Sequence, residues 1–167
     1  MPTRLLLVSD THVPHRARAI PAELWDAVDA ADVVIHAGDW TGIPLLVELT
    51  ERAAQLIGVR GNNDTDSGFA ALPEIAAATI DGLRFAVVHE TGAATGREAR
   101  CVARFPDADV LVFGHSHIPW DTTAESGLRL LNPGSPTDKR RQPHGTFVTA
   151  VVDDGELRDV EFVEVLG

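Results

Sequence analysis

The first sixty residues alternate between short apolar runs and amphipathic segments, and this alternation constrains the fold more than any other feature. The apolar runs are "RLLLVSD" (4–10), "DVVIHAGD" (32–39) and "AQLIGVRG" (54–61). Each is short and continuous, as expected of a strand covered on both faces. The segments between them, 20–31 and 43–54, repeat apolar residues at helical spacing and carry a proline near the start. This β-α-β-α-β order predicts a parallel sheet.

The second half of the chain has a different pattern. The stretch 78–90 is typical of two strands joined at Asp81-Gly82, and a second Asp-Gly turn joins 145–152 to 156–163. The remaining predicted elements are a helix over 96–105 and strands over 109–113 and 128–131. We therefore expect an α/β protein with mixed sheets, in which a parallel half is followed by an antiparallel half.

Composition excludes several classes of protein. Hydrophobic residues make up 44% of the 167 residues and charged residues 23%, so we expect one globular domain over residues 1–167. The single cysteine, Cys101, excludes an intramolecular disulfide framework and a multi-cysteine zinc site. No apolar run approaches the roughly 18 residues of a membrane span, and the first run is too short for a signal peptide. We expect a cytoplasmic protein with no membrane partner, and the net charge of −11 argues against a nucleic-acid partner.

Residue types that bind metals follow five of the predicted strands. These residues are Asp10 and His12, then Asp39, then Asn62, Asn63 and Asp64, then His89, and finally His115 and His117. Because ligand sites of α/β sheets lie at the carboxyl ends of the strands, we expect these side chains to converge. Carboxylate and imidazole without thiolate suit Mn²⁺, Fe²⁺, Zn²⁺, Co²⁺ or Ni²⁺. The set is too large for one tetrahedral ion and fits two divalent ions that share a carboxylate.

Each motif alone also has a structural interpretation. A single histidine at a strand end is more often structural than a ligand, and we interpret His36 as supporting the site rather than binding a metal. In "GHSH" (114–117), strand alternation predicts that the two histidines point the same way, one to each ion. We interpret His15 and His144 as solvated loop residues. The run Lys139-Arg140-Arg141 is interpreted as a solvated loop, with enough positive charge to receive a substrate phosphate as the alternative.

The ordered motifs "DTH", "GDW", "GNND", "HE" and "GHSH" resemble the signature of the calcineurin-like metallophosphoesterase superfamily. The short chain and its "NPGS" at 132–135 are similar to the small phosphodiesterase branch. The resemblance implies two mixed β-sheets stacked face to face, flanked by helices. It also implies that two divalent ions, Mn²⁺ first and iron, zinc, nickel or cobalt as alternatives, hold a hydroxide that hydrolyses a small phosphate ester.

The same resemblance implies a role for each residue of the set. Asp10, His12 and His117 resemble the ligands of the first ion, Asp39 the bridging carboxylate, and Asn62, His89 and His115 the ligands of the second ion. The candidate catalytic residues are Asn63, Asp39 and His89. Two positions depart from the family pattern, because Asn63 replaces a histidine beside the leaving group and Thr91 replaces the second histidine of an "HGH" motif. An amide donates a hydrogen bond but delivers no proton, so we expect slow turnover of poor leaving groups.

Three functions stay open at this point. The leading hypothesis is a two-metal phosphodiesterase. The alternatives are a phosphomonoesterase that acts on a small metabolite or a phosphoprotein, and a non-catalytic scaffold, since a branch of the superfamily keeps this fold for partner binding in the retromer coat. A homo-oligomer is compatible with the sequence.

Overall fold

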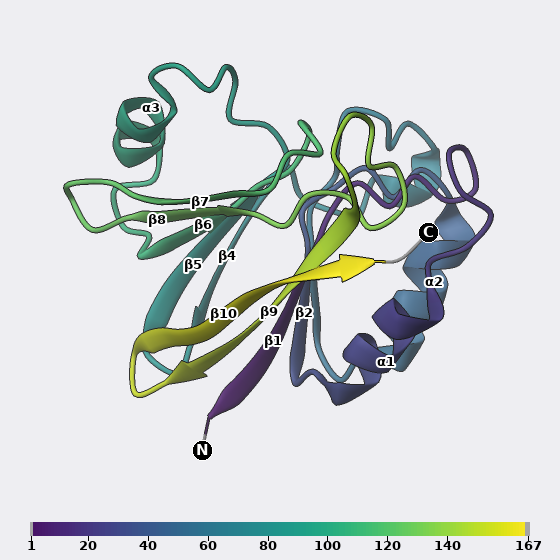
Figure 1. Cartoon of the computed structure of the whole chain (residues 1–167), viewed down its shortest axis with the longest axis horizontal. Helices are drawn as coiled ribbons and strands as arrows, with labels where there is room; N and C mark the ends of the chain where they lie inside the picture. The colour runs from purple at the N-terminus through teal and green to yellow at the C-terminus, as the bar shows by residue number, and fades with distance from the viewer. Residues whose placement is uncertain (1, 166–167) are drawn as a thin grey trace.

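The computed structural model describes residues 2–165, and its two β-sheets lie face to face with helices outside (Figure 1). The first sheet has the order β10-β9-β1-β2-β3, with β1 (Thr3–Val8), β2 (Val33–His36), β3 (Leu56–Gly58), β9 (Gly145–Asp153) and β10 (Glu156–Val165). The second has the order β4-β5-β6-β8-β7, with β4 (Ile75–Ile80), β5 (Leu83–Val88), β6 (Val110–Val112), β7 (Trp120–Thr123) and β8 (Arg129–Asn132). The helices are α1 (Ala22–Ala30), α2 (Ile43–Arg52), α3 (Arg97–Arg104) and a 3₁₀ turn at Ser67–Phe69. The predicted α/β fold with two stacked mixed sheets is confirmed.

Strand direction differs from the prediction in the second sheet. In the first sheet β1, β2 and β3 are parallel, as predicted, and β9 and β10 add an antiparallel pair. The expectation of an antiparallel second half was wrong, because β5, β6 and β8 are parallel to one another and only the edge strands β4 and β7 are antiparallel. The connection through α3 makes β6 parallel to β5. Strand β7, which the sequence pattern did not reveal, runs in the opposite direction, so that β8 is again parallel to β6.

Alternation along the strands divides the core into three layers. Leu5 and Leu7 of β1 point into the space between the two sheets, whereas Leu6 and Val8 point outwards, towards α1 and α2. Strands β5 and β6 alternate in the same way, and their outer side chains pack with Cys101 of α3. Burying a side chain of this size stabilises the fold by about 1.5–3 kcal/mol. Both faces of the central strands are therefore apolar, which explains the continuous apolar runs of the sequence.

The hairpin turns and the carboxyl ends of the parallel strands of the first sheet lie at opposite ends of the molecule. The turns at Asp81-Gly82 and Asp154-Gly155 have positive φ at both central residues, as two-residue hairpins require, and they lie near Thr3 at the beginning of β1. The carboxyl ends of β1 and β2 lie towards the top of Figure 1, away from these hairpins, and β3 runs parallel to β2. Within residues 2–165, no helix is long and apolar enough to cross a membrane.

Candidate metal centre

Five of the candidate ligands meet at the carboxyl ends of the strands. The buried group consists of Asp10, His12, Asp39, His89 and His117. Asp10 Oδ1 lies 3.5 Å from His117 Nε2, and Asp39 Oδ2 lies 3.4 Å from His12 Nε2 and 3.3 Å from His89 Nε2. Their donor atoms form two overlapping clusters that share Asp10, each compact enough to surround one ion. The structure thus brings together side chains more than a hundred residues apart.

The atoms that face the middle of this group have no hydrogen-bond partner. They are Asp10 Oδ1 and the Nε2 atoms of His12, His89 and His117, all of them buried. Leaving one such polar atom unsatisfied costs about 1–3 kcal/mol, so unpartnered groups are rare in folded proteins and need an explanation. A divalent cation accepts electron pairs from a carboxylate and from neutral imidazoles. The residues present therefore fit a bound metal.

Hydrogen bonds at Nδ1 fix the tautomer of two of these imidazoles. His89 Nδ1 lies 2.8 Å from the carbonyl oxygen of Ala37, and His117 Nδ1 contacts the carbonyl oxygen of Asp138. Because a carbonyl only accepts, each Nδ1 carries the proton and donates it. When the ring is neutral, Nε2 presents a lone pair to the centre, which is the arrangement that metal-binding histidines require.

The remaining two candidate ligands lie at the surface, beside the buried group. His115 has a side chain that is 43% exposed, and its ring lies 5.3 Å from that of His89. Its Nδ1 is 3.1 Å from Asn62 Oδ1, so these two side chains bond to each other. Its Nε2 lies 3.6 Å from a carboxylate oxygen of Glu90. The structure thus places Asn62 and His115 next to the centre but does not join them to the buried cluster.

The two histidines of "GHSH" do not share an environment. His117 is buried against Asp10, whereas His115 faces the surface. The expectation that they point the same way rested on strand alternation, but both residues have positive φ, 76° at His115 and 62° at His117. A left-handed backbone ends the strand before these residues, so the alternation rule does not apply to them.

Backbone strain is concentrated in the candidate ligands. Among residues 2–165, ten non-glycine residues have positive φ, and five of them are Asp10, His12, Asp39, His115 and His117. This conformation is uncommon for residues other than glycine, and it persists at functional sites where the surrounding structure enforces it. The strain therefore falls on five of the seven candidate ligands that the strand-end motifs predicted.

Two glycines allow the backbones to approach one another closely enough for this geometry. A Cβ atom at Gly61 would collide with the backbone and carboxylate of Asp39. At Gly114 it would lie 2.6 Å from Asp10 Oδ2 and would also collide with the Ser9 hydroxyl. Any larger residue at either position would displace a candidate ligand.

Supporting residues that sequence reasoning did not assign hold the two carboxylate ligands. The buried Asp64 accepts hydrogen bonds from the backbone N–H groups of Asp39, Thr41 and Gly61 at 2.8–2.9 Å. The Ser135 hydroxyl donates to the carbonyl oxygen of Asp10 at 2.7 Å. A signal for both was present, because Asp64 ends "GNND" and Ser135 ends "NPGS".

Burial and neighbouring charges shift the pKa values of the centre in opposite directions. Burial disfavours ionisation of Asp10, but the imidazoles of His117, His12 and His89 outweigh it and hold the pKa of Asp10 well below its ordinary value. Burial likewise opposes ionisation of Asp39, and His89 and Asn63 lower the pKa of this carboxyl. For His89, the two carboxylates overcome the effect of burial and raise its pKa to about 9. The metal-free centre therefore favours charged carboxylates and a protonated His89.

His36 has the supporting role that the sequence predicted. Its ring is fully buried and stacks on Trp40, with 3.6 Å between the ring centroids. His36 Nδ1 accepts from the backbone N–H of Gly38, and Nε2 donates to the Thr11 hydroxyl. Burial lowers the pKa of His36 to about 3, so this histidine is neutral and fully hydrogen-bonded.

The two departures from the family pattern have clear structural positions. Asn63 donates to the carboxylate of Asp39 twice, through its backbone N–H at 2.9 Å and its side-chain Nδ2 at 2.8 Å. Thr91 is buried, and its hydroxyl accepts from Nε of Arg97 at 2.9 Å. Asn63 therefore contacts a candidate ligand, whereas Thr91 supports the neighbouring loop.

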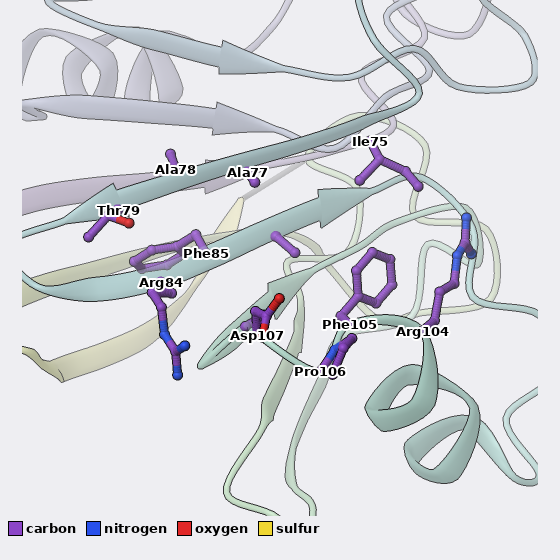
Figure 2. Close-up of a pocket in the computed structure, with 12 residues that line it drawn as sticks. Ile75, Ala77, Ala78, Thr79, Arg84, Phe85, Arg104, Phe105, Pro106 and Asp107 are labelled. Carbon is purple, nitrogen blue, oxygen red and sulfur yellow. The ribbon is translucent and has the colours of Figure 1, made fainter.

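Two hollows lie on the second-sheet side of the molecule. A cavity of about 430 Å³ beside β4 contains none of the candidate ligands, and Figure 2 shows Ile75, Phe85 and Phe105 among the side chains that line it. A second cavity of about 540 Å³ is lined by Asn62 and His89, together with charged residues. The second cavity therefore opens at the metal centre, on its exposed side.

Comparisons with known proteins agree with this geometry. Residues 3–155 match the family model of the calcineurin-like phosphoesterase superfamily domain. The chain belongs to this family. A probable metallophosphoesterase of Methanothermobacter thermautotrophicus is 35% identical to it, over 94% of this chain and 90% of that protein. As a member of the calcineurin-like phosphoesterases, the chain belongs to a family of metal-dependent hydrolases.

Solved structures also share the fold of this calcineurin-like phosphoesterase. The solution structure of the Thermotoga maritima protein TM1076 has a TM-score of 0.77 and 31% identity, covering 98% of this chain and 99% of that one. Vps29 of Chaetomium thermophilum has a TM-score of 0.80 and 21% identity, covering 96% and 95%. The likeness to Vps29 shows the fold alone.

Proposed function

We propose that the chain is a phosphodiesterase that binds two divalent cations, with Mn²⁺ as the first candidate. The observation that carries this proposal is a set of four buried metal-ligating atoms that have no hydrogen-bond partner, on Asp10, His12, His89 and His117. A protein that bound no metal would gain stability by pairing or removing these groups. Diesters are favoured over monoesters because the chain resembles the short phosphodiesterase branch of its family.

In this proposal, each candidate ligand has the role that the family resemblance implies. Asp10, His12 and His117 would hold the first cation, Asn62, His89 and His115 the second, and Asp39 would be a ligand of both. Two divalent cations at this place supply an activated water molecule and positive charge that offsets the charge of the transition state. Asn62 and His115 bond to each other in the structure, so they give up that bond to become ligands.

The other residues orient these ligands and the substrate. Asp64 and Asn63 hold Asp39 in place, the first through its backbone and the second through its carboxylate. The remaining Nδ2 proton of Asn63 is a donor for an oxygen of the substrate, beside the shared carboxylate. Since an amide has no proton to give up, the leaving oxygen departs without general acid help from this residue.

A scaffold of the same fold is the alternative, and the buried centre is the observation that separates the two. A partner-binding protein needs neither unpartnered donor atoms nor strained ligand backbones in its interior. Five candidate ligands show both a left-handed backbone and metal-binding chemistry, which supports the enzyme. Ester hydrolysis by the metal-loaded protein distinguishes the two functions, because a scaffold can bind metal without hydrolysing a substrate.

The decisive experiment compares two aryl esters with Mn²⁺ present. The protein should hydrolyse bis(p-nitrophenyl) phosphate faster than p-nitrophenyl phosphate, and Asp39→Ala should lower kcat/KM for the diester by about 10³-fold or more, since several kcal/mol of transition-state stabilisation are lost. The matched control is Asp26→Ala on the exposed face of α1, which should leave the rate unchanged. A faster monoester reaction would assign a phosphatase. No hydrolysis of either ester by a protein shown to contain metal would refute the proposal.

A further inference from the structure

Positive charge is distributed very unevenly over this acidic chain. The loops 12–20 and 136–144 together contain five basic residues, Arg16, Arg18, Lys139, Arg140 and Arg141, and a single acidic residue, Asp138. The rest of the chain holds nine of the 14 basic residues and 24 of the 25 acidic residues. We call the five basic side chains the basic rim. It carries a net positive charge within a protein whose net charge is −11.

Both loops are fixed beside the buried side of the metal centre. The Thr137 hydroxyl donates to the carbonyl oxygen of Thr11 at 2.6 Å, which ties one loop to the beginning of the other. The backbone N–H of Arg16 donates to the carbonyl of His12 at 2.7 Å. The carbonyl of Asp138 accepts the Nδ1 proton of His117. The basic rim therefore begins at Arg16, four residues after the candidate ligand His12. Its second part begins at Lys139, directly after Asp138, which contacts the candidate ligand His117.

The charges of the basic rim are accessible and largely unneutralised. All five side chains belong to exposed residues. Among residues 2–165, only Arg16 of the five has a carboxylate within 4.0 Å, and it lies at that limit from Asp138. Exposed arginines on the first sheet, such as Arg4 and Arg158, do have carboxylate partners, at 3.2 Å and 3.0 Å. A cluster of unpaired cations in a protein of opposite net charge attracts an anionic ligand.

We propose that the basic rim binds a second phosphate group, so that the substrate is a phosphodiester that carries a further phosphate next to the one that is cleaved. This inference rests on the proposed function, because the metal centre supplies the position of the cleaved group. Arginine forms paired hydrogen bonds with phosphate oxygens, and lysine adds a point charge. Both a small nucleotide and a short nucleic-acid strand present this chemistry, so the net charge alone does not exclude a nucleic-acid substrate.

Three substrates with the same cleaved bond test the proposal. They are the thymidine dinucleotide TpT, its 5′-phosphorylated form pTpT, and 5′-phosphorylated octathymidylate. The ratio of kcat/KM for pTpT to that for TpT should exceed one in the unmodified protein. A further gain with the octamer would identify a strand as the ligand, whereas no further gain would identify a small nucleotide. A ratio of one for pTpT, with no gain for the octamer, would overturn the proposal.

Two pairs of Arg→Gln substitutions distinguish phosphate binding at the basic rim from a general effect of the protein's net charge. Arg140→Gln combined with Arg141→Gln should lower the pTpT to TpT ratio by about fivefold to tenfold, as expected for two exposed ionic contacts. Arg4→Gln combined with Arg158→Gln removes the same charge at the opposite end of the strands and should leave the ratio unchanged. Neither pair should alter hydrolysis of bis(p-nitrophenyl) phosphate, which has no second phosphate. Equal effects of the two pairs on the ratio would contradict the proposal.

A binding measurement without metal keeps this inference separate from the proposed function. With chelator present, pTpT should shift backbone amide resonances in loops 12–20 and 136–144, and added salt should weaken this binding. Absence of bis(p-nitrophenyl) phosphate hydrolysis by the metal-loaded protein would refute the proposed function, whereas shifts confined to other parts of the chain in the chelator experiment would refute the basic rim.

Discussion

The metal centre has a buried half and an exposed half that differ in how they are built. In the buried half, Asp10, His12 and His117 have side chains at most 6% exposed, and the atoms that face the centre have no partner. In the exposed half, Asn62 and His115 bond to each other, and His115 is 43% exposed. The buried half is already organised in the structure, whereas Asn62 and His115 would have to give up their mutual bond to bind a metal.

This difference has a physical cause and a functional consequence. Electrostatic interactions are stronger in a buried, low-dielectric site, so a cation there binds tightly and unpaired donors are costly without it. At the surface, water competes for the same groups, and the polar cavity lined by Asn62 and His89 gives access to them. We therefore expect the buried half to retain its metal and the exposed half to exchange metal and receive substrate.

The largest expected effect comes from removing one histidine from each half. His117→Ala should weaken metal affinity by about 10²-fold or more, because it removes a preorganised ligand and exposes the centre, and His115→Ala by about tenfold. Competition with a chromophoric chelator measures both. His144→Ala, in an outer loop, is the control and should change nothing. Equal losses for His115 and His117 would break the distinction between the two halves.

An intermediate effect is expected on thermal stability. At a metal concentration of about 100 Kd, binding contributes about 2.7 kcal/mol, so chelation should lower Tm by about 5–11 °C in a chain of this size, and Mn²⁺ should restore it. The response should persist in His115→Ala and be strongly reduced in His117→Ala. Calorimetry measures Tm, with elemental analysis to verify that the metal is removed. A normal response in His117→Ala would place the stabilising ion in the exposed half.

The smallest expected effect concerns Asn63, which contacts Asp39, the carboxylate that we propose as the bridging ligand. Because Asn63 supplies no proton, kcat/KM should fall steeply as the pKa of the leaving group rises in a series of aryl phosphodiesters. Asn63→His should flatten this dependence and accelerate the poorest leaving groups by about tenfold, which is less than the roughly 10²- to 10⁴-fold of established general acid catalysis because the introduced ring lacks partners that position it. Asn63→Gln retains an amide and should retain the steep dependence. A flat dependence in the unmodified protein would show that another group supplies the proton.

Local patterns were sufficient for most of the fold and for the identity of the candidate ligands. Continuous apolar runs identified the central strands because these strands are covered on both faces, and Asp-Gly turns identified both hairpins because few residues accept two successive positive φ angles. Strand direction in the second sheet escaped prediction. It depends on how α3 and the edge strand β7 pack, and neither leaves a periodic signal that shows direction.

The sequence by itself determined which residues carry metal-binding chemistry, since five strands end in carboxylate, amide or imidazole groups. Only the tertiary structure decided what each of them can do. It buried His117 and exposed His115 two residues away, engaged Asn63 with Asp39, and joined two distant basic loops beside the centre. The physical reason is that the burial of a side chain, its hydrogen-bond partners and the local electrostatic field depend on residues that are distant in the sequence. The carboxylate of Asp10, for example, accepts from the backbone N–H of His115, 105 residues away.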